Sequence, residues 1–267
     1  MMQVRAPAVA GLFYPLDASE LNGKVAALLR DARRPTAAPP PKVLIVPHAG
    51  YVYSGPVAAS GYTHIAPLRG RVSRVVLLGP AHRVAAQGLA LPSALAFATP
   101  LGTVPLDGDA MRSVADLRQV CTSDRAHADE HSLEVHLPFL QATLGEFRLV
   151  PFAVGDATAE EVAQVLDRLW GGEETLIVVS SDLSHYLPYP RACVKDEFTV
   201  ETILRLKPEL DHQQACGATP INGLLLAARS RKLIPRLIDL RNSGDTAGDK
   251  SRVVGYAAFV FHEPATR

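Results

Sequence analysis

The sequence predicts a single α/β domain over residues 1–267, with a mostly parallel or mixed central sheet that is flanked by helices. Two observations support this fold class. Short runs rich in Val, Ile and Leu recur along the chain, and their unbroken apolar character is typical of strands covered on both faces. Segments with helical spacing of apolar residues lie between these runs, and this alternation over the whole length favours one domain.

The elements are expected in the following order. Residues 21–34 have the Leu and Val spacing of a helix, and the Pro-rich stretch 35–41 is expected to be a stiff surface connector. The segments expected to contain a strand are 42–50, 73–83, 147–156, 174–185, 233–241 and 253–261. The expected helices between them are 54–65, 130–144, 158–170, 190–207 and 220–231. In the third of these helices, Thr158 and Glu161 have the spacing of a capping box.

The charges balance: 27 Lys and Arg residues oppose 27 Asp and Glu residues, so the formal net charge is zero. Nucleic acids and anionic membranes attract proteins with an excess of Lys and Arg, and the balance argues against both partners. No apolar run approaches the roughly 18 residues that a membrane span requires. The three cysteines form no CxxC pair and the first residues make a poor signal peptide, which together predict a cytoplasmic location.

Histidines follow three of the four strongest strand candidates. His48 and His82 come directly after the first two, and the segment 174–185 ends in a stretch that contains Asp182 and His185. Ligands of open α/β sheets bind beyond the carboxyl ends of the strands, so these side chains are expected to converge on one site. Three independent, hydrogen-bonded surface histidines are the alternative that this pattern leaves open.

A second group of ionisable residues follows residue 126. His127, Glu130 and His131 match the H-x-x-E-H pattern of one class of zinc peptidases, in which two histidines bind zinc and the glutamate activates water. That hypothesis requires a helix that begins before His127. The alternative is structural, because acidic residues in a first helical turn favour the helix dipole without any catalytic role.

Cys216 lies just before a helix that Pro220 is expected to begin. A cysteine near a helix N-terminus can have a lowered pKa and bind a metal as the thiolate, and a buried apolar role is the alternative. The chain has no glycine-rich phosphate loop, no G-x-S-x-G elbow and no dinucleotide fingerprint. Phosphoryl transfer, serine hydrolysis and nicotinamide chemistry therefore lack their usual motifs.

A series of ordered motifs resembles the Memo family, also called AmmeMemoRadiSam system protein B. The motifs are AGLFYP (10–15), VPHAGYVYSG (46–55), LLGPAH (77–82), TPLGTVPLD (99–107), DEHSLEVHLPFLQ (129–141), VVSSDLSHY (178–186), ACGATPINGLL (215–225) and GYAAFVF (255–261). That family is similar in fold to the class III extradiol ring-cleaving dioxygenases, which hold non-haem Fe(II). The resemblance therefore implies one α/β domain with a metal-binding cleft at the strand ends.

The resemblance also implies roles for individual residues. The implied metal ligands are His48, His82 and Cys216. The implied catalytic residues are His185, Asp182 and His131, with His185 oriented by Asp182 and acting as an acid or base or as a further ligand. The expected metal is Fe(II), with Cu or Zn as alternatives. A thiolate is softer than the carboxylate of the ring-cleaving enzymes, and it suits Cu(I), Zn or Fe with a different reactivity.

Two functional hypotheses follow. In the first, the protein is a non-haem iron oxidoreductase of the dioxygenase type, and Tyr51 and Tyr186 line a cleft for an aromatic or phenolic small molecule. In the second, the same cleft holds a peptide or a partner protein without turnover, and the resemblance implies a radical enzyme as one such partner. Exposed aliphatic helices also lead us to expect a homodimer.

Overall fold

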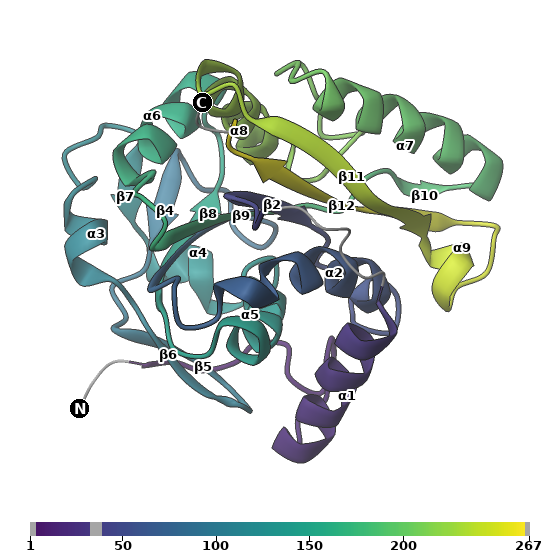
Figure 1. Ribbon diagram of the computed structural model, residues 1–267, viewed down its shortest axis with the longest axis horizontal. Helices are drawn as coiled ribbons and strands as arrows, with labels where there is room; N and C mark the ends of the chain where they lie inside the picture. The colour runs from purple at the N-terminus through teal and green to yellow at the C-terminus, as the bar shows by residue number, and fades with distance from the viewer. Residues whose placement is uncertain (1–3, 33–38, 265–267) are drawn as a thin grey trace.

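The computed structural model describes residues 4–32 and 39–264. A nine-stranded sheet crosses its centre (Figure 1). The strands of this sheet are β2 (Val43–Val46), β3 (Arg74–Pro80), β4 (Leu89–Leu91), β7 (Val120–Thr122), β8 (Arg148–Val154), β9 (Thr175–Ser180), β10 (His185–Leu187), β11 (Ile234–Asn242) and β12 (Val253–His262). Their order is β10-β12-β2-β9-β3-β8-β4-β7, and β11 pairs with β12 off this path. A smaller sheet with the order β1-β5-β6 contains β1 (Val4–Arg5), β5 (Ala96–Thr99) and β6 (Gly102–Pro105).

Four neighbouring strands, β2, β9, β3 and β8, run parallel to one another. In their register Val46 pairs with Ser180, and Leu78 pairs with Val179, so the carboxyl ends of these strands lie at one edge of the sheet. The neighbours β12 and β4 join in the antiparallel direction, which makes the sheet mixed. This arrangement confirms the predicted α/β class.

Helices cover both faces of the sheet. The α-helices are α1 (Ala18–Asp31), α2 (Gly55–Tyr62), α3 (Gly108–Arg112), α4 (Asp124–Ala128), α5 (Leu137–Leu144), α6 (Ala159–Leu169), α7 (Tyr189–Leu204), α8 (Ala218–Ser230) and α9 (Ser243–Thr246). Among the described residues, 3₁₀ helices span Thr63–Leu68 and Glu134–His136. In Figure 1, α1, α2 and α5 lie below the sheet, and α6, α7 and α8 lie above it.

Alternate residues of the central strands enter two apolar clusters, one on each face. Leu44 and Val46 of β2 belong to the cluster that includes α1, α2 and α5, whereas Val43 and Ile45 belong to the cluster that includes α6 and α8. All four side chains are at most 1% exposed. Burying each such side chain contributes roughly 1.5–3 kcal/mol, and burial on both faces explains why these strands are unbroken apolar runs.

Most of the predicted elements are present, with shifted ends. Helix α1 begins earlier than predicted because the Asp17 side chain accepts the Glu20 N–H and caps the helix. The capping box predicted from Thr158 and Glu161 is formed at the start of α6. Residues 33–38, which carry the end of the predicted first helix and most of the predicted connector, lie outside the described residues.

The helix predicted over 130–144 is shorter than expected. Helix α5 begins only at Leu137 after the 3₁₀ helix Glu134–His136, and residues 129–133, here called the turn segment, form turns and loop instead of helix. The Glu130 carboxylate accepts the backbone N–H of Ser132 at 2.9 Å, a local bond that competes with helical hydrogen bonding. This turn segment carries residues of the candidate site described below.

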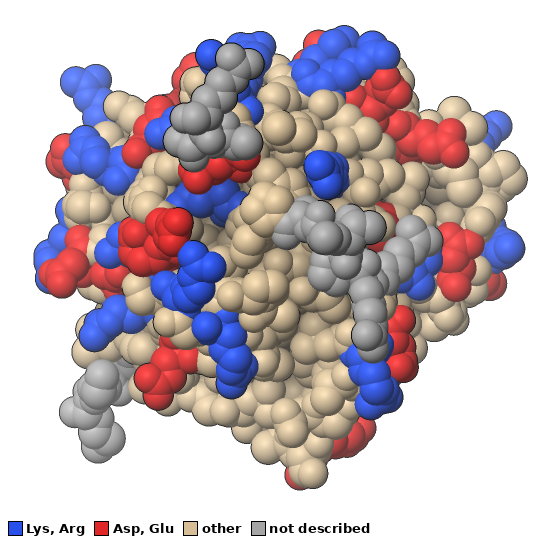
Figure 2. Space-filling view, viewed as in Figure 1, with Lys and Arg blue, Asp and Glu red and all other residues tan. Residues whose placement is uncertain are grey.

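The molecular surface mixes both signs of charge. On the face shown in Figure 2, Lys and Arg side chains are interspersed with Asp and Glu side chains. Within the part of the chain that the structure describes, no helix combines the length and the apolar character needed to span a bilayer.

Candidate metal site

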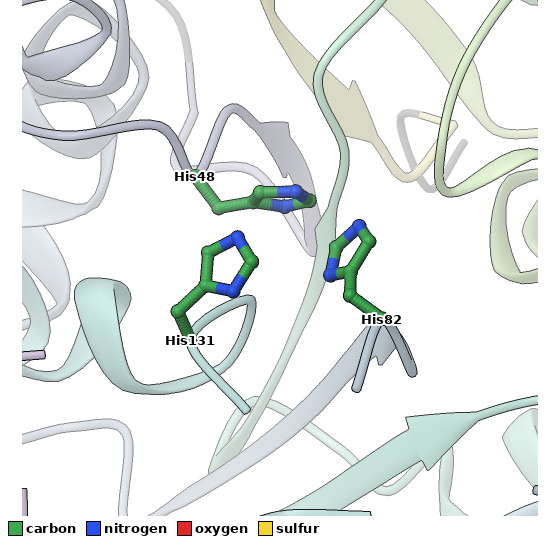
Figure 3. Close-up of side chains that lie close together, drawn as sticks. All are labelled: His48, His82 and His131. Atoms are coloured by element: carbon green, nitrogen blue, oxygen red, sulfur yellow. The ribbon is translucent and has the colours of Figure 1, made fainter. Parts of the chain in front are cut away.

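Three histidines from separate segments converge beyond the carboxyl ends of the central strands (Figure 3). His48 follows β2, His82 follows β3, and His131 lies in the turn segment 129–133. One ligand atom from each ring lies within 4.8 Å of the others, so the group could hold a metal ion. The structure therefore brings His48 and His82 together with His131, whereas Asp182 and His185 are not part of this group of ligand atoms among the described residues.

Burial keeps these rings suited to metal binding. His48 is 2% exposed, and burial, with smaller effects from neighbouring histidines, holds the pKa of His48 well below its usual value. Burial likewise lowers the pKa of His131 to about 4. His131 Nδ1 is a buried nitrogen without a hydrogen-bond partner among the described residues. Because neutral imidazoles offer lone pairs to metals, this donor set fits a transition metal ion.

The Glu130 carboxylate holds His82 in place. Its Oε2 accepts the backbone N–H of His82 at 2.5 Å, and its Oε1 lies 3.0 Å from His82 Nδ1. Burial alone would raise the pKa of Glu130. Hydrogen bonds from His82 and from the Ser132 N–H, together with the charge of His82, lower this pKa to about 2. An ionised carboxylate only accepts, so His82 Nδ1 donates, and in the neutral ring Nε2 keeps the lone pair. The sequence suggested Glu130 as a peptidase base or as an acidic residue of a first helical turn; its contact with His82 emerges from the fold.

Cys216 adjoins the histidine cluster from the loop before α8. Its Sγ lies 3.4 Å from His48 Nε2 and accepts the Asp182 backbone N–H at 3.3 Å. Gly217 permits this approach, because a Cβ there would lie 2.6 Å from the Ser180 carbonyl oxygen. Burial and the Asp182 charge raise the pKa of the Cys216 thiol to about 12, contrary to the lowering expected near a helix N-terminus. Its role as a metal ligand stays a prediction.

Asp182 and His185 have different partners from those expected. Asp182 Oδ1 accepts the backbone N–H of His48 at 2.8 Å, and burial raises the pKa of this carboxyl to about 7. His185 Nδ1 lies 2.8 Å from the Leu183 carbonyl oxygen. The structure therefore corrects the expectation that Asp182 orients the His185 ring: the aspartate supports the backbone at His48, and a backbone carbonyl orients His185.

The two tyrosines expected to line the cleft differ in exposure. Tyr51 is 3% exposed, and its hydroxyl donates to the Val135 carbonyl oxygen at 2.6 Å. Tyr186 is 62% exposed, and its ring lies against the His185 ring with centroids 5.8 Å apart. These positions favour Tyr186 over Tyr51 as a surface for a ligand. Substrate binding by either residue stays a prediction.

The helix that the peptidase hypothesis requires is not formed. Helix α4 ends at Ala128, so His127 and His131 lie on different segments. His127 is 2% exposed, its Nε2 lies 2.8 Å from the Ala90 carbonyl oxygen, and its ring packs against Phe97. His127 therefore belongs to the core, and it is not part of the group of ligand atoms found among the described residues.

The chain matches one protein family along nearly its whole length. A family model described as Memo-like protein matches residues 5–260. A MEMO1 family protein of Aquifex aeolicus is 38% identical in an alignment that covers 97% of this chain and 100% of the relative. A MEMO1 family protein of Sulfolobus acidocaldarius is 35% identical in an alignment that covers 97% of this chain and 99% of the relative.

A solved structure shows a similar fold. The crystal structure of an uncharacterized protein from Escherichia coli K12 matches with a TM-score of 0.53 and 14% identity, over 81% of this chain and 98% of that chain. A similarity at this level of identity shows a shared fold, and it does not show a shared activity. Because the family model and the relatives each cover almost all of the sequence, the chain belongs to the Memo family.

Proposed function

We propose that this protein binds a transition metal ion at His48 and His82, with Fe(II) as the first candidate and Cu or Zn as alternatives. The observation that supports this most strongly is the convergence of three imidazole rings with ligand atoms within 4.8 Å of one another. The third ligand is either Cys216 or His131. Cys216 adjoins His48, and His131 completes the group of three histidines. A site with three protein ligands leaves positions open for a substrate, as in non-haem iron enzymes.

The proposal extends to a dioxygenase-like oxidoreductase that acts on a small phenolic molecule. Bound iron would supply the dioxygen chemistry. His185 is the candidate base for the phenol proton: Nδ1 donates to the Leu183 carbonyl oxygen, so Nε2 holds the lone pair. Burial lowers the pKa of His185, which keeps the ring neutral near pH 7. Tyr186 beside it offers an exposed aromatic surface to a planar substrate.

Metal binding is tested by anaerobic Fe(II) titration and by metal analysis after desalting. We expect one bound ion per chain and, in His48→Ala, at least about tenfold weaker binding. The third ligand is identified by comparing Cys216→Ala with His131→Ala, since only a thiolate ligand produces sulfur-to-metal charge-transfer absorption. His64→Ala, which removes a buried histidine outside the cluster, is the control. Negligible uptake by wild type and Cys216→Ala alike would reject the site.

Turnover is tested by oxygen consumption of the iron-loaded protein with catechol and simple phenols. We expect consumption that depends on the phenol and is lost in His185→Ala while iron binding is retained. An iron-loaded protein that consumes no oxygen with any of these phenols would oppose the oxidoreductase part of the proposal and leave metal binding intact.

A second candidate function is a binding protein for a peptide or for a partner such as a radical enzyme. It is favoured by the apolar side chains of Val194 and Phe198 on α7, which are 69% and 63% exposed. A pull-down with purified partner separates the two surfaces: loss in His48→Ala places the partner at the cleft, and loss only in Phe198→Asp places it on α7. Both functions are proposed for a reducing cytoplasm, where the free cysteines stay thiols.

A further inference from the structure

The Ser180 hydroxyl lies at the centre of a buried hydrogen-bonded cluster beside His48. Ser180 Oγ is 2.6 Å from His48 Nδ1, 2.8 Å from His136 Nε2 and 2.6 Å from the Ser132 carbonyl oxygen. These four residues are at most 2% exposed, so their polar atoms depend on one another for hydrogen bonds.

The number of hydrogens determines the direction of each bond. A hydroxyl has a single hydrogen and a carbonyl oxygen only accepts, so Ser180 donates to Ser132. Both ring nitrogens that face Ser180 Oγ must then donate to it. In its neutral form His48 therefore carries its one proton on Nδ1 and its lone pair on Nε2, the nitrogen that lies 3.4 Å from Cys216 Sγ.

His136 and Tyr62 obey the same rule of donors and acceptors. Burial lowers the pKa of His136 to about 3, so this ring is neutral and carries one proton, which is on Nε2. Its Nδ1 then accepts the Tyr62 hydroxyl hydrogen at 2.9 Å. Tyr62 is fully buried, so this bond is the one its hydroxyl donates. Tyr62, His136 and Ser180 thus form one chain of hydrogen bonds that ends at His48.

We propose that Ser180, supported by His136 and Tyr62, is a positioning residue that holds His48 in the Nδ1-protonated tautomer and so presents His48 Nε2 to the metal. A hydroxyl free to rotate could donate to His48 Nδ1 and stabilise the opposite tautomer, which puts a proton on the ligand nitrogen. The Ser132 carbonyl oxygen prevents this by taking the hydroxyl hydrogen. The presentation of His48 Nε2 to a metal rests on the proposed function, whereas the tautomer of His48 in the metal-free protein does not.

Ser132 connects this chain of hydrogen bonds to Glu130, the residue that holds His82. Its carbonyl oxygen takes the hydroxyl hydrogen described above, and its backbone N–H donates to Glu130 Oε1 at 2.9 Å. Its own hydroxyl donates to the Pro80 carbonyl oxygen at 2.8 Å. Gly79 leaves room for this contact, because a Cβ there would lie 2.7 Å from Ser132 Oγ. One residue of the turn segment thus supports both strand-end histidines.

The tautomer is tested by nitrogen-15 NMR of metal-free protein labelled at histidine, since protonated and unprotonated ring nitrogens have well-separated shifts. The His48 signals are assigned by their loss in His48→Ala. In wild type we expect a protonated Nδ1 and an unprotonated Nε2. In Ser180→Ala the acceptor of the Nδ1 proton is missing, and we expect the Nε2-protonated form of His48 to appear. In Tyr62→Phe we expect a smaller redistribution, together with a change at His136.

Ser184→Ala is the matched control. Ser184 is equally buried, follows the same strand, and bonds through its backbone N–H to Asp196 at 3.0 Å. This variant should leave the His48 signals unchanged, which separates the specific effect of Ser180 from the loss of any buried hydroxyl. In Fe(II) titrations, Ser180→Ala should bind about 10- to 100-fold more weakly than wild type, and the control should bind like wild type.

Each result decides a stated part of the inference. An Nε2-protonated His48 in metal-free wild type overturns it, and so does an unchanged His48 tautomer in Ser180→Ala. Wild-type protein that shows the expected tautomer but takes up no metal rejects the proposed function and leaves the statement about the tautomer standing.

Discussion

His82 Nδ1 donates to Glu130 Oε1 at 3.0 Å, and the backbone N–H of His82 donates to the other oxygen of the same carboxylate at 2.5 Å. The carboxylate therefore sets both the position of the residue and the tautomer of its ring. Carboxylate–histidine pairs of this kind orient metal ligands in many metalloproteins. Here the pair joins a strand end to a turn segment that lies 48 residues later in the chain.

Replacing Glu130 with glutamine should weaken metal binding. The amide of Glu130→Gln cannot accept all three N–H groups that the carboxylate now accepts, two from His82 and one from Ser132. We expect Fe(II) affinity to fall about 10- to 100-fold, measured by anaerobic competition with a chelator. Glu160→Gln, at an exposed position in the first turn of α6, is the control. Equal affinities of the two variants would contradict the supporting role.

Removing His127 should cost stability and leave metal binding intact. His127→Ala deletes a buried ring and its contact with the Ala90 carbonyl oxygen, for which we expect a loss of roughly 2–4 kcal/mol in the free energy of unfolding. The measurements are urea unfolding and Fe(II) titration of the same preparation. A folded variant with no metal binding would revive the peptidase arrangement.

A buried charge cluster should anchor the N-terminal segment. The fully buried Glu134 carboxylate bonds Arg5 Nη1 at 2.6 Å, the Tyr14 hydroxyl at 2.6 Å and two backbone N–H groups. Glu134→Gln leaves Arg5 without its counter-charge, and we expect a loss of about 3–5 kcal/mol in the free energy of unfolding. Glu173→Gln breaks the exposed Arg71–Glu173 pair and should cost less than about 1 kcal/mol. If both variants lost a similar free energy of unfolding, burial would not be the reason that the Arg5–Glu134 pair matters more.

Asp196 should make stability depend on pH. Its side chain is buried, accepts the Ser184 N–H at 3.0 Å, and has a pKa raised by burial to about 6. In the unfolded chain the pKa of an aspartate is about 3.9, so the folded state binds this proton more tightly. The contribution of Asp196 to stability is therefore greatest below about pH 4 and is lost as the pH rises through about 6.

The variant Asp196→Asn removes this dependence. We expect it to be more stable than wild type at pH 8, by up to roughly 3 kcal/mol, and nearly equal to wild type at pH 4. Free energies of unfolding from urea titrations at the two pH values check this. A gain of the same size at both pH values would show that charge burial is not the cause.

Parts of the site were predictable because they depend on local order along the chain. His48 and His82 directly follow strands, and the carboxyl ends of neighbouring parallel strands must lie at one edge of a sheet. The helix over 130–144 was predicted too long because the pattern of apolar residues does not reveal that the Glu130 carboxylate takes local N–H groups. Spacing alone likewise placed His127 beside His131, although α4 ends between them.

The sequence by itself determined the α/β class, the central strands and the histidines at their ends. Unbroken apolar runs indicate buried strands, and the helices between them indicate that neighbouring strands are parallel. Only the tertiary structure decided which side chains support those histidines. The bond from Glu130 to His82, the approach of Cys216 to His48, and the Ser180 hydroxyl cluster join segments far apart in the chain. Such contacts depend on how whole elements pack and on which buried polar groups need partners, which no local pattern of residues encodes.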